Sequence, residues 1–553
     1  DLRLAAERAW RVAAYDGKEA RVLRAPLISP ERREELITLV DRTRKLAAAS
    51  IMNRYRQRLQ ELVSDAQQKR TVQKLSVQAK KQRYRLSLRQ LVDQFWDSGL
   101  SMARPIWLCS PESVASMFPL KPGMFDLVVF DEASQCPVES SIGALVRARS
   151  VVIAGDDQQM PPSHFFQASN QDLDDEEAQD ETLLASRSVL EVSRLALDST
   201  TLRWHYRSED EQLIAFSNQA FYAGKLYTAP RATRRGEEAE VTGICFEQLD
   251  GYWVDQTNQV EAERVVAWIS ELLTAPNPPS IGVVTFNLKQ AELILELVRQ
   301  KTFEDPIFAA AYSKDKERPL VEQLFVRNLE NVQGDERDVM LMSVGYGPSE
   351  PGGKLHARFG PLGMKGGGKR LNVAITRARR AYVVLTSFDP DELTVAHTRH
   401  DGPKLFKVFL RYARAVSEDR QQEVNACLTE ARELAGGHGI AASTRAAFGR
   451  PVGQRTREAM ARELRELGYE VEENIGLGNL HLDLSVHHPE HQGARLGIDL
   501  MNFLSIPDPM TREVYLPRFW ARMGWTILRV TPGMWRDEKQ EVLELIEQTI
   551  TRG

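Results

Sequence analysis

Two adjacent carboxylates that end an apolar run are the residues of this chain with the most evident chemistry. Residues 125–135 read Phe-Asp-Leu-Val-Val-Phe-Asp-Glu-Ala-Ser-Gln, so Asp131 and Glu132 directly follow a predicted buried strand. Acidic side chains at the carboxyl end of such a strand face the crevice above the sheet. There an aspartate can hold Mg²⁺ and a glutamate can orient or deprotonate water, as hydrolysis of a nucleoside triphosphate requires. The alternative is a solvated acidic pair at a strand end.

Five further segments place polar residues at the ends of predicted elements. They are Gly-Asp-Asp-Gln-Gln-Met-Pro-Pro at 155–162, Leu-Arg-Trp-His-Tyr-Arg-Ser at 202–208, Ile-Gly-Val-Val-Thr-Phe-Asn at 281–287, Val-Gln-Gly-Asp-Glu-Arg-Asp at 332–338 and Leu-Asn-Val-Ala-Ile-Thr-Arg-Ala-Arg at 371–379. Taken with Asp131-Glu132, the set resembles motifs II, III, IV, V and VI of superfamily 1 helicases. The most similar branch is the nonsense-decay type, superfamily 1B. Each segment alone is weakly specific, but the set is very specific and covers roughly residues 104–412.

The resemblance implies two RecA-like domains with ATP in the cleft between them. It assigns Asp131 to Mg²⁺ and Glu132 to the role of catalytic base. It implies that Gln159 contacts the γ-phosphate and the attacking water, with Gly155 and Asp156 in the same nucleotide-binding loop. The alternative for Gln159 is an ordinary hydrogen-bond donor of a loop.

The same resemblance assigns residues of the second RecA-like domain. Arg207 and Arg377 would be arginine fingers that stabilise the charge of phosphoryl transfer. The segment Gln333, Gly334 and Glu336 would sit at the ribose and couple the two domains, and Thr285 would contact nucleic acid. Surface ion pairs are the alternative for the two arginines.

One motif of the family is missing from this sequence. No G-x-x-x-x-G-K-[ST] phosphate-binding loop occurs, and Gly-Gly-Gly-Lys-Arg at 366–370 has Arg in place of Ser or Thr and no preceding strand. Such a loop supplies the main anion site for ATP. We therefore expect it to lie upstream of residue 1, and we expect this part of the protein alone to bind ATP poorly.

The alternation of predicted strands and helices predicts parallel sheets covered by helices. Together with the resemblance, this implies an α/β fold with two RecA-like parallel-sheet domains, a helical insertion and a small C-terminal α/β domain. Strands are predicted at 105–109, 126–130, 151–154, 281–285, 339–343 and 382–386, and helices at 137–148, 187–197, 258–273, 287–300 and 371–380. The predicted domains are a remnant of the first RecA-like domain at 1–30, the helical insertion at 31–103, the first RecA-like domain at 104–190, the second at 191–412, a linker at 413–440 and the C-terminal domain at 441–553.

The C-terminal segment carries a second pair of acids on neighbouring predicted strands. Asp483 and Asp499 can share a divalent metal for phosphodiester cleavage. The segment resembles restriction-endonuclease-like, very-short-patch-repair-like domains. However, Met501 stands where that family has Lys or Asp, and a thioether cannot hold Mg²⁺ or position a water. An active nuclease, a degenerate domain that binds nucleic acid and an unrelated α/β unit all remain open.

Bulk composition leaves the partner undecided, whereas local charge is more informative. The chain has 553 residues, a net charge of −5 and four separated cysteines, and it shows no apolar run of membrane length. We expect a cytoplasmic protein without a membrane partner. Residues 69–89 contain no acid and include Lys80, Lys81, Arg83 and Arg85. This basic stretch can follow phosphates, or it can be a solvated helix face.

These features favour a nucleic-acid-dependent ATPase that acts as a translocase or helicase on single-stranded or forked DNA, in DNA repair or anti-phage defence. RNA is the alternative substrate. A non-hydrolysing nucleic-acid-binding scaffold with a degenerate nuclease domain is a second hypothesis, and a structure-specific nuclease clamped by the motor domains is a third. Partner subunits are left open by the sequence.

Overall fold

The computed structural model describes residues 30–64, 66–83, 85–162, 188–232, 241–353, 355, 359–436, 454–489, 495–500, 506 and 508–552. The described residues up to Thr200 form one compact unit, and those from Thr201 onward form another. The acid-rich segment 172–181 and Met501 lie outside the described residues. Among the helices that are described, none combines the length and apolar character needed to cross a membrane.

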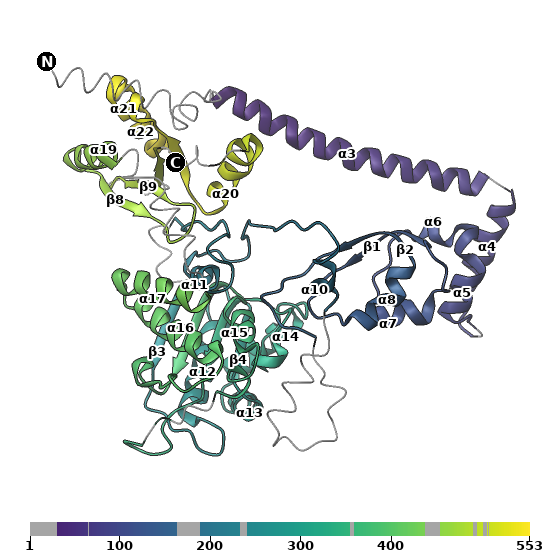
Figure 1. Cartoon of the computed structure of the whole chain (residues 1–553), viewed down its shortest axis with the longest axis horizontal. Helices are drawn as coiled ribbons and strands as arrows, with labels where there is room; N and C mark the ends of the chain where they lie inside the picture. Colours follow the sequence, from purple (N-terminus) through teal and green to yellow (C-terminus); the bar gives the residue numbers. More distant parts are fainter. Residues whose placement is uncertain are drawn as a thin grey trace. The chain divides into compact units, whose positions relative to one another are not determined.

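The first unit begins with the predicted helical segment, which the structure divides into several helices. These are α3 (Pro30–Ser64), α4 (Ala66–Lys80), α5 (Leu88–Phe95) and the short α6 (Ser101–Ala103), with a π-helical turn at Trp96–Leu100. Figure 1 shows α3 as one long, uninterrupted helix. Helix α5 begins at a capping box, in which the Ser87 side chain accepts from the Gln90 backbone and the Gln90 side chain accepts from the Ser87 backbone.

A short parallel sheet follows in the same unit. Strands β1 (Phe125–Phe130) and β2 (Ala148–Ile153) pair in parallel, joined by α8 (Val138–Val146), with α7 (Pro111–Met117) before them and α10 (Val189–Ser193) after them. The predicted strand at 105–109 is wrong. It pairs with no described strand, and Leu108 is 95% exposed. The helix predicted at 187–197 is confirmed only over α10, which the Ser188 side chain caps.

The second unit contains a five-stranded parallel sheet in the order β3-β7-β6-β4-β5. The strands are β3 (Gly243–Gln248), β4 (Ile281–Thr285), β5 (Phe325–Asn328), β6 (Arg337–Ser343) and β7 (Ala378–Thr386). Every residue of β4 is buried, as expected for a central strand covered on both faces. The predicted parallel α/β class is therefore confirmed for this unit.

Helices surround this sheet (Figure 1). They are α11 (Gln212–Ala220), α12 (Gln259–Leu273), α13 (Leu288–Glu304), α14 (Pro306–Glu317), α15 (Gly367–Ile375), α16 (Asp401–Ser417) and α17 (Gln421–Leu434). The helix predicted at 371–380 in fact ends at Ile375, and β7 begins at Ala378. Residues Ala378–Arg380 of the predicted helix join β7 instead, because pairing with β6 extends that strand back to Ala378 and overrides their helical pattern.

The C-terminal part forms a separate small sheet in the order β11-β10-β9-β8. Its strands are β8 (Glu470–Ile475), β9 (Leu482–His487), β10 (Leu496–Asp499) and β11 (Thr526–Arg529), and its helices are α19 (Gln454–Glu466), α20 (Leu516–Arg522), α21 (Pro532–Asp537) and α22 (Lys539–Arg552). Strands β8, β9 and β10 are antiparallel, whereas β10 and β11 are parallel. The helices pack on the sheet around a core that includes Met460, Leu484 and Trp535.

Candidate active site

In the first unit, two loops at the carboxyl ends of β1 and β2 are held side by side. The amide of Ala154 donates to the Phe130 carbonyl at 2.8 Å, and the amide of Ala133 donates to the Ala154 carbonyl at 2.9 Å. Asp131 and Glu132 lie in the first of these loops with exposed side chains. Glu132 has a φ of 52°, a left-handed conformation that a non-glycine residue adopts at a cost and that clusters at functional sites.

The second loop brings Gly155, Asp156 and Gln159 against the first. A Cβ on Gly155 would lie 3.0 Å from the Ser134 amide nitrogen, so only glycine fits without a shift of the backbone. The side-chain amide of Gln159 donates to Asp156 at 3.0 Å. The side-chain oxygen of Gln159, Oε1, is buried and has no hydrogen-bond partner in the described part of the chain. The structure thus gathers the acidic residues and the glutamine in adjacent loops.

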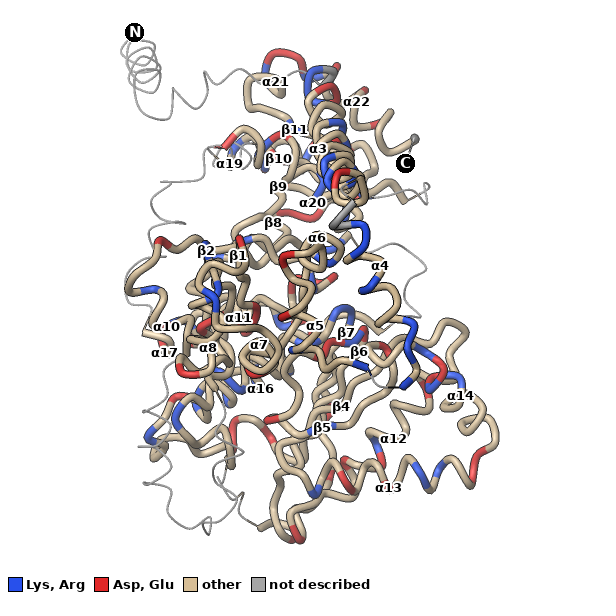
Figure 2. The backbone as a smooth tube through the Cα atoms, turned by 90° about the vertical axis from the view of Figure 1, so that its right-hand side faces the viewer, with Lys and Arg blue, Asp and Glu red and all other residues tan. Residues whose placement is uncertain are grey.

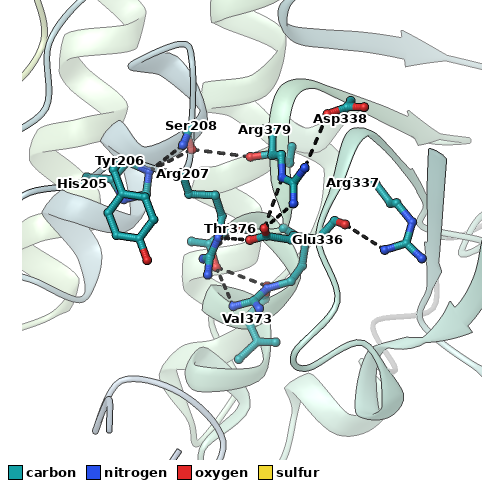
Figure 3. Close-up of polar contacts among 12 residues, drawn as sticks. His205, Tyr206, Arg207, Ser208, Glu336, Arg337, Asp338, Val373, Thr376 and Arg379 are labelled. Atoms are coloured by element: carbon teal, nitrogen blue, oxygen red, sulfur yellow. Dashed lines mark hydrogen bonds and ion pairs between the residues drawn. The ribbon is translucent and has the colours of Figure 1, made fainter. Parts of the chain in front are cut away.

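A cluster of charged side chains forms in the second unit, at the amino ends of β6 and β7 (Figure 3). Glu336 precedes β6 and accepts from two arginines that are distant in sequence. The Nε of Arg207 lies 2.6 Å from Glu336 Oε2, and the Nε of Arg379 lies 3.2 Å from Glu336 Oε1. Arg207 also donates from Nη1 to the Thr376 carbonyl at 3.4 Å. One carboxylate therefore holds two guanidinium groups in place.

The charge state of Glu336 follows from these contacts. Partial burial alone would raise its pKa, but the hydrogen bonds from Arg379 and Arg207 outweigh that effect and lower the pKa below its usual value. Glu336 is therefore ionised at neutral pH, and a second carboxylate, that of Asp338, lies 3.9 Å from Arg379 Nη1. The two guanidinium groups are donors that suit an anion such as a phosphate.

Arg377 is placed differently from the exposed position expected of an arginine finger. It is 3% exposed, and its Nε donates to the Val373 carbonyl at 2.7 Å while Nη2 contacts the Thr376 hydroxyl at 3.3 Å. The side chain folds back on the last turn of α15, because Arg377 lies between the end of that helix and the start of β7. Arg379, the second arginine of the same motif, joins Arg207 instead. Arg379 was not among the predicted site residues, although it lies in the same motif as Arg377, and this was the signal that could have identified it.

We call the acidic loops of the first unit and the arginine cluster of the second unit the two half-sites. Two more features of the half-site in the second unit matter for nucleotide binding. Gly334 has a φ of 87° and a Cβ there would meet nothing within 4 Å, so the loop before β6 turns sharply beside open space. The side-chain nitrogen of the neighbouring Gln333 is buried and lacks a hydrogen-bond partner among the described residues. Tyr206, next to Arg207, is 69% exposed. Its exposed ring offers a face on which a nucleobase can stack. This role was not assigned to Tyr206 from the sequence.

The residues predicted to contact nucleic acid lie in contrasting places. Thr285 is fully buried at the end of β4 and donates to the Asn287 carbonyl at 2.7 Å, so in this conformation its hydroxyl faces the interior. The basic stretch 69–89, by contrast, runs along α4, where Figure 2 shows basic residues on the backbone, and its four predicted contact residues lie at and just after the end of that helix. Lys80, Arg83 and Arg85 are exposed, and Lys81 is half-buried.

The two acids of the C-terminal domain share one face of its sheet. The antiparallel register pairs Ile498 with Leu484, and its continuation sets Asp499 opposite Asp483. Burial raises the pKa of Asp483, whose Oδ2 accepts from the Leu500 amide at 2.7 Å. Within the described ranges, no group of three or more His, Cys, Asp or Glu side chains is arranged to hold a metal ion. The pair alone is a sparse metal site.

Asp131 of the first unit suits Mg²⁺ better than the Asp483–Asp499 pair does, because its carboxylate is exposed and can be reached by a hydrated ion and its phosphate partners. Asp131 is exposed, and one of its oxygens accepts from the Glu132 amide at 3.0 Å. A carboxylate oriented in this way is a ligand that Mg²⁺ prefers, with water and substrate phosphates supplying the rest of the shell.

Comparison with protein families matches three parts of the chain. A model described as an AAA domain, AAA_11, matches residues 17–165, and a second AAA-domain model, AAA_12, matches residues 184–389. The model REase_MTES_1575 matches residues 457–550. The boundary between the two AAA matches falls near the boundary between the two compact units.

Curated proteins similar to this chain are named as helicases. An uncharacterized ATP-dependent helicase of Mycoplasma genitalium, MG140, is 34% identical over 325 residues, which are 58% of this chain and 28% of that protein. The DNA replication ATP-dependent helicase/nuclease DNA2 of Gallus gallus is 23% identical over 50% of this chain and 25% of its own length. The 5'-3' DNA helicase ZGRF1 of Mus musculus is 26% identical over 48% and 13%. The chain therefore matches less than a third of the length of each of these relatives.

Proposed function

Because this chain belongs to the superfamily 1 ATP-dependent helicases of the nonsense-decay type, with a restriction-endonuclease-like domain after the motor domains, we propose that it is a nucleic-acid-dependent ATPase that moves along single-stranded DNA. The observation that carries the proposal is the Arg207–Glu336–Arg379 cluster, since it brings two guanidinium groups from distant motifs together at the amino ends of β6 and β7.

We propose the following division of labour, with the two half-sites acting on one ATP. Glu132 accepts the proton of the attacking water, and Gln159 orients that water. Arg207 and Arg379 stabilise the negative charge that develops on the phosphoryl oxygens, and Arg377 does so only if its side chain leaves the end of α15. Asp131 would hold Mg²⁺, which when bound neutralises charge on the phosphates.

DNA is the substrate that we propose in preference to RNA. Two of the similar proteins are named as DNA helicases, and the C-terminal match is to a restriction-endonuclease-type model. The exposed basic residues at the end of α4 would contact backbone phosphates, independently of base sequence. DNA repair or anti-phage defence is the setting that we propose, and it rests on analogy with the family.

For the C-terminal domain we propose DNA binding without cleavage. The support is chemical, since Asp483 and Asp499 lie opposite each other and, in the described part of the chain, no group of three or more His, Cys, Asp or Glu side chains is arranged to hold a metal ion. Nicking of plasmid and forked DNA with Mg²⁺ or Mn²⁺ tests this part. Nicking by the wild-type protein that Asp483→Ala abolishes would establish a nuclease and overturn the proposal.

The motor function is tested by ATP hydrolysis with the full-length protein. Single-stranded DNA is expected to stimulate Mg²⁺-dependent hydrolysis, and Glu132→Gln is expected to lower kcat by about 100-fold or more while ATP binding is kept. Glu139→Gln, an acid of α8 in the same unit, is the matched control. Equal turnover by Glu132→Gln and the wild type would refute the proposed catalytic base and favour a non-hydrolysing scaffold.

A further inference from the structure

The C-terminal domain shares a hydrophobic core with residues 204–232 of the second RecA-like domain. This joint core contains buried residues from both sides, among them Ala229 and Ala232 from the motor side and Leu482, Trp520 and Trp525 from the C-terminal side. Trp204 packs edge-on against Phe519, with ring centroids 5.2 Å apart. Such packing between whole aromatic side chains indicates a fixed joint and not a loose tether.

Hydrogen bonds fasten the same joint. The Ala232 amide donates to the Met523 carbonyl at 2.9 Å, and the Trp525 indole donates to the Pro230 carbonyl at 2.8 Å. The buried Glu211 accepts from the Leu477 amide at 2.7 Å. Because the first two of these bonds engage backbone groups of the motor domain, they fix the course of its chain at Pro230 and Ala232.

The joint extends to the candidate active site. The Nη2 of Arg522, the last residue of α20, donates to the Tyr206 carbonyl at 2.7 Å. That carbonyl belongs to the peptide group that links Tyr206 to Arg207, the residue held by Glu336. Trp204, which packs on Phe519, lies only three positions before Arg207. The C-terminal domain thus contacts the chain at two points shortly before Arg207.

We propose that Arg522 and Phe519 are positioning residues for Arg207, so that the C-terminal domain forms part of the ATPase machinery apart from any contact it makes with DNA. The inference rests on the proposed ATPase function. We assign neither residue a contact with the nucleotide. Phe519 acts through Trp204, and Arg522 acts through the Tyr206–Arg207 peptide group. A guanidinium group stabilises a transition state only when its backbone holds it at the correct distance and orientation to the phosphate.

The test compares Arg522 variants of the full-length protein by single-stranded-DNA-stimulated ATP hydrolysis. Arg522→Ala is expected to lower kcat about 10- to 100-fold through misplacement of Arg207, with an unchanged melting temperature, since the Arg522 side chain is exposed. Arg522→Lys keeps a cationic donor for the Tyr206 carbonyl and is expected to recover most of the loss. Arg455→Ala, an exposed arginine of α19 in the same domain, is the matched control and is expected to leave kcat unchanged.

A double-variant cycle distinguishes positioning from a separate effect. If Arg522 acts through Arg207, then Arg522→Ala changes kcat less than about twofold further in an Arg207→Ala background. Full additivity of the two losses would overturn the inference, and so would wild-type kcat in Arg522→Ala. If Arg207→Ala itself keeps wild-type turnover, the proposed ATPase role of the site fails and the inference fails with it. Failure of Arg522→Ala alone leaves the proposed function intact.

Discussion

The two half-sites differ in how firmly their charges are held. In the first unit, Asp131 and Glu132 are exposed, and their carboxylates accept hydrogen bonds from residues of their own loop, the Glu132 amide and the Gln135 side chain. In the second unit, Arg207 and Arg379 are tied to Glu336 across long sequence separations. The basic half is thus organised before any ligand binds, whereas the acidic half depends on backbone conformation alone. Preorganised charge is the larger source of transition-state stabilisation, so the basic half should be the more sensitive to substitution.

The largest effect is expected at Arg207. We predict that Arg207→Ala lowers the DNA-stimulated kcat by about 1,000-fold, as loss of an arginine finger does, with a smaller change in ATP affinity. Steady-state hydrolysis with the full-length protein checks this. Arg203→Ala, an exposed arginine of the same segment, is the control. A loss below about threefold would break the comparison by showing that the basic half is dispensable.

Glu336 should have an intermediate effect. Glu336→Gln removes the charge that holds both arginines, so we predict a fall in kcat of about 10-fold together with a lower melting temperature. Asp335→Asn provides the control, since Asp335 lies in the same loop and pairs with Arg327 instead. Wild-type kcat in Glu336→Gln would mean that the arginines need no carboxylate to hold them.

The joint between the motor and the C-terminal domain should respond to pH through Glu211. Burial raises the pKa of Glu211 to about 7 from 4.5, so its contribution to stability is complete below the unfolded pKa and is lost as pH rises through about 7. We predict that the melting temperature falls as pH rises over this range and that Glu211→Gln gives a flatter profile.

Two other groups set the background of that pH profile. Burial also raises the pKa of Glu261 to about 7, whereas burial lowers that of His205 to about 4 and acts in the opposite direction. The difference between wild type and Glu211→Gln is therefore the quantity to measure, with the exposed Glu209→Gln as control. Parallel profiles for wild type and Glu211→Gln would contradict the assignment.

The smallest effect is expected at the basic stretch. If Lys80 and Lys81 contact phosphates, their joint replacement by alanine lowers the slope of log affinity against log salt for single-stranded DNA by about 1.4. Replacing Lys45 and Arg54, both exposed on α3, is the control. An unchanged slope would assign the stretch to the alternative, a solvated helix end whose cations favour the C-terminus of α4.

The sequence predicted the parallel α/β class because apolar strands and motif order are local signals, but it misplaced elements that tertiary pairing decides. Residues 105–109 have the composition of a strand but pair with none of the strands that the structure describes, and they are irregular. Ala378–Arg380 have a helical pattern and become the start of β7, which pairs there with β6. The motif arginines were identified by type, but whether Arg377 or Arg379 faces Glu336 depends on where α15 ends, and the burial of Thr285 depends on the whole sheet.

The central claim, that carboxylates and guanidinium groups from the two units act on one phosphoryl transfer, is tested most directly by a cycle of Glu132→Gln and Arg207→Ala. The measurement is the single-turnover rate of ATP hydrolysis with saturating single-stranded DNA. Residues that act as a unit are strongly non-additive, so we predict a double variant hardly slower than the slower single variant. Wild-type rates in either single variant, or losses that multiply in full, would contradict the account.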